Sequence, residues 1–104
     1  MEYTKLSDLV NSSFTIEDYN GFSWKKWDNE NKKMLISKAF EKDYRKVYTF
    51  TTNRGVLDLG KGQVGELLVK LFDQKKSGLK NRTFFVESNG KKGMDIRYFF
   101  KLEQ

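Results

Sequence analysis

The sequence predicts a mostly β domain in which a single amphipathic helix covers one end of five strands. A clean helical period occurs only in residues 59–76, where apolar side chains recur at i, i+3, i+4, i+7 and i+8. The residues of this stripe, all expected to face the core, are Val64, Leu67, Leu68, Leu71 and Phe72. Elsewhere the apolar residues alternate or form short runs, as in strands. The 104 residues contain no linker or repeat and are expected to form one domain, 1–104.

The first expected strand is long and spans residues 14–27. Within it, Asn20-Gly21 indicates either a tight turn or a bend in one continuous strand. Upstream of this strand a short apolar trace predicts one helical turn or a lead-in that fills the core. The trace consists of Leu6, Leu9 and Val10.

Two further strands are expected before the helix. A polar connection over residues 28–33 leads to a strand at 34–40, and a third strand follows at 44–52. The third is rich in the aromatic and β-branched residues that suit a pleated surface. Residues 53–55 are expected to form a turn, and residues 56–59 to lead into the helix.

After the helix, strands at 82–88 and 94–102 are expected to form a hairpin around Asn89-Gly90, a strong turn signal. Alternation sorts the last strand into two faces. The expected core face comprises Met94, Ile96, Tyr98, Phe100 and Leu102. The expected outer face comprises Asp95, Arg97, Phe99 and Lys101. In the partner strand, Phe84 and Val86 are expected in the core.

The resulting order, β-β-β-α-β-β, is that of an OB-fold, a five-stranded, partly open Greek-key barrel whose helix plugs one end. A winged-helix domain is the first alternative, but it needs two or three helices before its basic hairpin. A generic α+β sheet with one packed helix is the second alternative.

Composition excludes several classes of function. The chain has no cysteine and no histidine, so disulfides, Cys or His metal sites and His-dependent triads are excluded. The acidic residues fall in polar turns without acid/base spacing, and Gly60-Lys61-Gly62-Gln63 lacks the ending of a phosphate loop. We therefore expect no enzyme activity, no metal and no cofactor. Without a membrane-spanning run or a signal-peptide layout, a cytoplasmic protein that does not enter the membrane is expected.

The balance of charge and aromatic residues points to a polyanion. The net charge is +6, and 15% of the residues are aromatic. Most of the excess lies in residues 53–104, where 11 Lys and Arg oppose 6 Asp and Glu. A basic, aromatic-rich small domain favours nucleic acid as the partner.

The first strand carries the strongest local signal for binding. Trp24-Lys25-Lys26-Trp27 interleaves two flat π surfaces with two cations, which single-strand binding needs for base stacking and phosphate contact. Because Trp24 and Trp27 differ by three positions, a regular strand turns them to opposite faces. One of the two is therefore expected in the core.

The other candidate binding residues are cations and aromatics of the later strands and loops. Those on or beside the second and third strands are Lys38, Tyr44, Arg45, Lys46, Tyr48 and Arg54. The last hairpin adds Lys91 and Lys92 at its tip, and Arg97 and Phe99 on its outer face. In an OB-fold this tip is the loop that commonly closes over a bound strand.

Three features together carry a family resemblance: the strand order, Leu57-Asp58-Leu59 leading into the helix, and the closing hairpin of residues 87–100. Over residues 6–102 the chain resembles the small OB-fold single-stranded DNA-binding proteins of phages and Gram-positive mobile elements. The resemblance implies coating of exposed single strands in DNA replication or recombination. Bacterial housekeeping single-strand binders end in an acidic tail, whereas residues 101–104 here follow a strand directly. Recruitment of partners through such a tail is therefore not implied.

We thus expect a non-enzymatic protein that binds single-stranded DNA with little sequence preference. RNA is the alternative ligand, and a second copy of the chain or replication proteins are further candidate partners. A protein-interaction module that uses exposed aromatics as hydrophobic anchors is the alternative from a different class.

Overall fold

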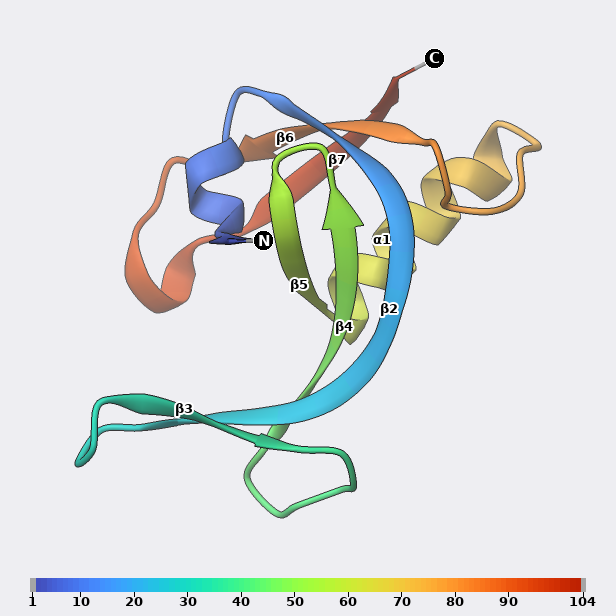
Figure 1. Ribbon diagram of the computed structural model, residues 1–104. Coiled ribbons are helices and arrows are strands. Elements are labelled where there is room, and N and C mark those ends of the chain that lie inside the picture. The colour runs from blue at the N-terminus through green and yellow to red at the C-terminus, as the bar shows by residue number, and fades with distance from the viewer. Residues whose placement is uncertain (1, 104) are drawn as a thin grey trace.

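The computed structural model describes residues 2–103, and this part of the chain is mostly β with a single α-helix (Figure 1). The seven strands are β1 (Tyr3–Thr4), β2 (Ser13–Asp28), β3 (Lys33–Ser37), β4 (Arg45–Thr52), β5 (Gly55–Gly60), β6 (Thr83–Ser88) and β7 (Tyr98–Glu103). The helices are α1 (Lys61–Asp73) and two 3₁₀ turns, η1 (Leu6–Leu9) and η2 (Gly93–Asp95).

β2 is the strand on which the sheet is built. Its first residues pair with β6, its middle pairs with β4, and its last residues pair with β3. Figure 1 shows it as one long curved ribbon. The ladder with β4 shifts register twice, between Ile16 and Asp18 and between Tyr19 and Gly21, and Gly21 has φ +101°. Asn20-Gly21 is therefore a bend within one strand, and the tight-turn alternative is wrong.

The sheet is open and mixed, with the order β5-β4-β2-β6-β7 and β1 parallel to β5. Residues 56–59, predicted to be a non-strand lead into the helix, belong instead to β5, so this prediction was wrong. The chain reverses at Gly55 and runs back along β4. Gly55 has φ +121°, and a Cβ there would lie 2.7 Å from the Glu2 carbonyl oxygen, so glycine is needed at this contact. The order predicted before the helix therefore lacked one strand.

The second expected strand, at 34–40, is present as β3 but ends three residues earlier and lies outside the main sheet. β3 ends at Ser37 and pairs only with the far end of β2, so the two form an arm that projects from the sheet (Figure 1). The five strands that build the main sheet are β2, β4, β5, β6 and β7.

The core collects inward side chains from both halves of the sheet, from η1 and from α1. Phe14, Phe84 and Phe100 are fully buried, with ring centroids 6.0 Å and 6.3 Å apart for the pairs that Phe14 makes. Leu6 and Leu9 of η1 are also buried, which confirms the predicted lead-in. After η1, Val10 bridges to Val86 of β6, so the N-terminal segment runs from β5 to β6.

The helix α1 is shorter and less deeply inserted than its sequence predicts. It begins after Gly60, whose N–H donates to the Gln63 Oε1 at 2.9 Å, and ends at Asp73. Leu67 and Leu71 are buried and Val64 packs against the core. Leu68 and Phe72, however, are 49% and 81% exposed, so their assignment to the core was wrong. The helix covers the sheet with a narrow stripe, and a rotation of about 100° per residue carries Leu68 and Phe72 past it.

The last hairpin has the predicted faces but a longer loop. Phe84, Val86 and Phe100 are buried, and Tyr98 and Leu102 pack against the core. β7 begins only at Tyr98, because residues 89–97 form a loop that contains η2. Met94 lies in this loop and is 97% exposed, which contradicts its assignment to the core.

Candidate nucleic-acid interface

The ladder between β2 and β4 brings aromatic residues and a lysine onto one face. Phe22 lies opposite Tyr48, and Trp24 lies opposite Lys46. Because alternate residues of a strand share a face, these four side chains project from the same side of the sheet. Phe50 and Leu59, whose side chains are buried, belong to the same side farther along the ladder. The four residues therefore extend the core-facing side of the sheet beyond the core.

We call Phe22, Trp24, Lys46 and Tyr48 the Lys46 cluster. The Lys46 Nζ lies 4.2 Å from the ring centroid of Phe22, 5.3 Å from that of Tyr48 and 5.4 Å from that of Trp24. The Phe22 and Trp24 rings meet edge to face, with centroids 5.5 Å apart. Phe22 is 49% exposed and the other three are partly exposed. The cluster thus presents ring surface and a positive charge together to the solvent.

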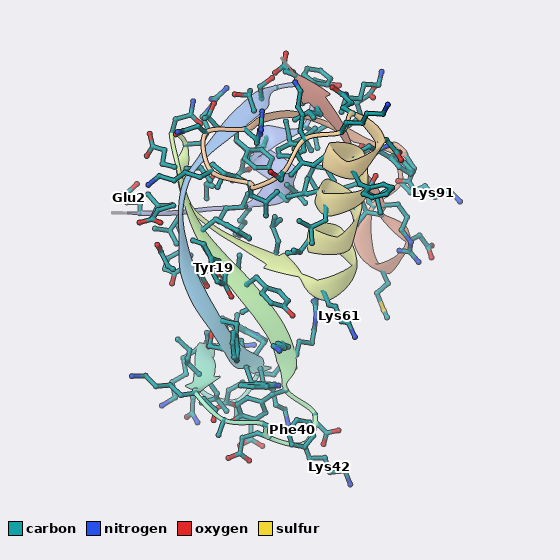
Figure 2. The ribbon with its side chains drawn as sticks, turned by 90° about the vertical axis from the view of Figure 1, so that its right-hand side faces the viewer. Glu2, Tyr19, Phe40, Lys42, Lys61 and Lys91 are labelled. Carbon is teal, nitrogen blue, oxygen red and sulfur yellow. The ribbon has the colours of Figure 1, made fainter. Side chains whose placement is uncertain are left out.

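A hollow continues this face toward the helix. Tyr19 is 49% exposed, and its ring lies 5.3 Å from that of Phe50. Figure 2 shows Tyr19 on β2, on the side of the sheet that the helix approaches. The hollow, of about 410 Å³, lies between these strands and the exposed Leu68 of α1, with Lys80 at its edge. Aromatic rings, an aliphatic side chain and a further cation are therefore next to the Lys46 cluster.

The opposite face of the same ribbon carries Lys25 and Trp27. Lys25 forms an ion pair with Asp58 of β5, and the two side chains are only 11% and 22% exposed. Asp58 also accepts a hydrogen bond of 2.6 Å from the Thr49 hydroxyl. Lys25 therefore already has an anionic partner within the fold, so a role in phosphate contact is not what its geometry favours.

Trp27 lies opposite Met34 of the arm, and both are about half exposed. Trp24 is partly exposed on the other face, so neither tryptophan is in the core and the prediction of one core tryptophan was wrong. Residues 26–28 of β2 pair only with β3, and residues 24 and 25 pair with both β3 and β4, so both tryptophans lie where β2 leaves the main sheet, away from the core.

The Trp27 face is also hollowed. A cleft of about 460 Å³ is lined by Trp27, Met34 and Asp58, with the cations Lys26 and Arg45 at the same opening. A second opening of similar volume, about 470 Å³, joins Arg45 to Arg97, between the start of α1 and the loop before β7. Lys26, Arg45 and Arg97 are all exposed, so this side of the molecule also combines an aromatic ring with cations.

The remaining candidates are more widely spread. Lys38 is exposed and Tyr44 half-buried in the connection between β3 and β4, which also carries the exposed Phe40 and Lys42, seen at the lower end of the molecule in Figure 2. Lys91 and Lys92 are exposed in the loop before β7, and Figure 2 shows Lys91 across α1 from Tyr19. These residues do not join the Lys46 cluster.

Two of the remaining candidates donate hydrogen bonds to nearby backbone carbonyls, and a third lies on the outer face of β7. Arg54, in the turn between β4 and β5, donates from Nε to the Ser13 carbonyl at 3.1 Å. Arg97 donates from Nη1 to the carbonyls of Ile96 and Met94. Phe99 is 49% exposed beside Glu87 on the outer face of β7, as its alternation predicts.

Sequence reasoning missed three exposed aromatics that complete these surfaces. Phe22 stands two residues before Trp24, and strand alternation alone would have placed both on one face. Tyr19 belongs to the same surface only because the bend at Gly21 shifts the register, which sequence alternation does not reveal. Tyr3 lies 4.9 Å below the Lys25 Nζ through the pairing of β1 with β5.

Within residues 2–103, no three acidic side chains gather as a metal site would require, and no helix has the length and apolar character to cross a membrane. No protein-family model, curated protein or solved structure matches the chain.

Proposed function

We propose that the chain binds single-stranded nucleic acid, with single-stranded DNA as the first ligand and RNA as the alternative. The observation that carries this proposal is the Lys46 cluster, where three partly exposed rings surround one ammonium group. Bases stack on aromatic rings without regard to sequence, and cations follow the phosphates between them. A cluster that offers aromatic rings and a cation within a few ångströms suits a nucleic-acid strand, which presents bases for stacking and phosphates for the cation.

The topology supports an OB-type barrel as the scaffold. Relabelled in order, β2, β4, β5, β6 and β7 provide a long bent first strand, a hairpin, a helix and a closing hairpin. The first of these strands pairs with the second and the fourth, as a Greek-key barrel requires. The arm formed by the end of β2 and β3 then lies in the connection between the first two barrel strands.

The role that this proposal implies is the one expected from the sequence, namely coating of exposed single strands in replication or recombination of a phage or mobile element. The net charge of +6 favours capture of a polyanion, and the partly exposed rings favour unpaired bases, which a duplex would hide. No chemical step is part of this proposal, and the ligand leaves unchanged.

The test is titration with a fluorescently labelled oligo-dT at low and high salt. We expect saturable binding and quenching of tryptophan fluorescence, both weakened by salt. Trp24→Ala should weaken binding by about 1–3 kcal/mol because it removes one stacking surface. Phe72→Ala is the matched control, since it removes an exposed ring of α1 that lies outside the Lys46 cluster. Absence of binding at low salt, or equal losses in both variants, would contradict the proposal.

A protein-interaction module is the second candidate, and one observation favours it. Leu68, Val69 and Phe72 form an exposed apolar surface on α1, at 49%, 56% and 81% exposure. Surfaces of this kind mark contacts with other proteins more often than isolated apolar residues do. If this candidate holds, Phe72→Ala would disrupt binding to the partner and Trp24→Ala would leave it intact.

A further inference from the structure

The cleft on the Trp27 face contains the carboxylate of Asp58, whose orientation is set by two hydrogen-bond donors. This cleft of about 460 Å³ adjoins another of about 470 Å³, and the residues lining both are Leu6, Lys25, Met34 and Asp58. The N-terminal segment from Tyr3 to Leu6 lies on one side of the second cleft, and Met34 and Ile36 of β3 lie on the other. Each volume falls within the range of small-ligand sites. Asp58 is the only acidic residue that lines both.

Asp58 is oriented by two donors from neighbouring strands. Lys25 of β2 reaches across β4 to one carboxylate oxygen, and the Thr49 hydroxyl donates to the other at 2.6 Å. A carboxylate has about four lone-pair sites, so each oxygen can still accept one more hydrogen bond. With 22% of its side chain exposed, Asp58 offers this remaining capacity to the cleft.

The rest of the first cleft suits a nucleotide. Trp27 is 49% exposed, and the cations Lys26 and Arg45 line the cleft together with a second carboxylate, Asp43. The charge of Asp58 is balanced by Lys25, so the carboxylate does not bring an uncompensated negative charge toward the phosphates. With three cations, Lys25, Lys26 and Arg45, against two carboxylates, the lining keeps a net positive charge that attracts a phosphodiester chain, and Asp58 offers a hydrogen-bond acceptor to a base.

We propose that this cleft binds one base of the bound strand and that Asp58 selects bases with an exocyclic amino group over thymine and uracil. The proposal rests on the proposed function and adds a base-selective subsite to it. An ionised carboxylate only accepts hydrogen bonds, and cytosine, adenine and guanine carry amino donors. Thymine and uracil offer a single N–H between two carbonyl oxygens, and those oxygens repel a carboxylate that approaches it.

The experiment compares labelled oligo-dC and oligo-dT of equal length at one salt concentration. The two pyrimidines have similar size and stacking surface, and they differ chiefly in the amino or carbonyl group at position 4. We expect the wild-type protein to bind oligo-dC about tenfold more tightly, at the low end of the discrimination that one well-placed side chain gives. Phe72→Ala, on the exposed side of α1, should keep this ratio.

Asp58→Asn should bring the ratio to one or below. Lys25 and Thr49 are both donors, so they would bind the oxygen of the new amide. The NH2 group of the amide would then face the cleft, where a donor would replace part of the acceptor surface. Trp24→Ala, on the other face, should weaken both oligonucleotides by the same factor and leave the ratio unchanged. A circular-dichroism melt of each variant identifies any loss of the fold.

Asp58→Glu provides a second variant that keeps the charge and the ion pair. Its longer side chain moves the carboxylate along the cleft, so we expect a folded protein with a reduced ratio. If both oligonucleotides bind but the ratio is one, or is unchanged in the folded Asp58 variants, the base-selective subsite is refuted while the proposed function stands. If neither oligonucleotide binds, both proposals fail.

Discussion

Three lysines, near the end of β2 and the start of β4, show how the surroundings of a side chain decide its role. Lys25 is 11% exposed and held by Asp58, so its charge is consumed within the fold. Lys26, the next residue, is exposed at the mouth of a cleft. Lys46 lies among three rings, where cation–π attraction of about 0.5–1 kcal/mol per exposed contact holds it. Only the last two have charge available for a ligand.

At the same scale, Asp28 stabilises the turn between β2 and β3 and should make that turn sensitive to acid. Its carboxylate accepts from the Asn31 side-chain amide at 2.8 Å and from the N–H groups of Asn31 and Glu30. These bonds, above all that from the Asn31 side chain, hold the pKa of Asp28 below its ordinary value of 3.8. The stabilisation is therefore complete above the ordinary value and is lost as the pH falls through the pKa of the folded state.

An acid titration followed by NMR at the Asp28 carboxyl carbon would measure this effect. We expect a midpoint below 3.8 in the native protein. Asn31→Ala should move the midpoint upward, because it removes the largest cause of the shift. A midpoint at or above the ordinary value, or one that Asn31→Ala leaves in place, would show that the turn does not depend on this carboxylate.

At the scale of the element, α1 shows that a helical stripe in the sequence can be wider than the face that is buried. Leu67 and Leu71 are 0% and 2% exposed, whereas Leu68, in the same stripe, is 49% exposed. α1 contacts the sheet at β7, β4 and β5, and Leu67 and Leu71 are its buried residues. Leu68 instead lines the hollow beside Tyr19 and Tyr48.

Two adjacent leucines therefore provide a matched test of how α1 packs. Leu67→Ala should lower the free energy of unfolding by about 2–5 kcal/mol, because it leaves a cavity in the core. Leu68→Ala makes the same chemical change at an exposed position and should cost about 1 kcal/mol or less. Denaturant unfolding of both variants measures the difference. Similar losses in the two variants would mean that the helix is rotated relative to the packing described here.

At the scale of the whole molecule, the candidate binding features lie on both sides of one curved ribbon. The Lys46 cluster and the hollow beside α1 occupy one side, and Trp27 with the Asp58 cleft occupies the other. A bound strand that used both would have to pass around the arm formed by the end of β2 and β3. The +6 net charge supplies the long-range attraction that either path requires.

Salt dependence separates this general attraction from local contacts. For single strands the logarithm of the binding constant should fall linearly with the logarithm of salt concentration, with a slope of about −0.7 per phosphate neutralised. Lys46→Gln should make the slope shallower by about 0.7, because one contact is removed. Lys101→Gln is a control of equal charge change, on β7 and paired with Glu87 at 3.1 Å. Equal changes of slope in both variants would mean that Lys46 acts only through the net charge.

Much of the fold could be predicted from the sequence, because local patterns determine it. The helical period identified α1, alternation placed Phe84, Val86 and Phe100 in the core, and the apolar trace identified η1. The candidate site was predicted in part for the same reason. Trp24, Lys46 and Tyr48 were named from their types and positions, and the ladder between β2 and β4 brings these three together.

The tertiary structure alone decided which residues meet across long separations. Asp58 lies 33 residues after Lys25, and their contact exists only because β5 pairs with β4 and β4 with β2. The same pairing turned a predicted lead into a strand, and the place where β2 leaves the main sheet left both tryptophans outside the core. Periodicity specifies which face of an element is apolar. Whether that face is covered depends on where the other elements lie, and that is a property of the assembled sheet.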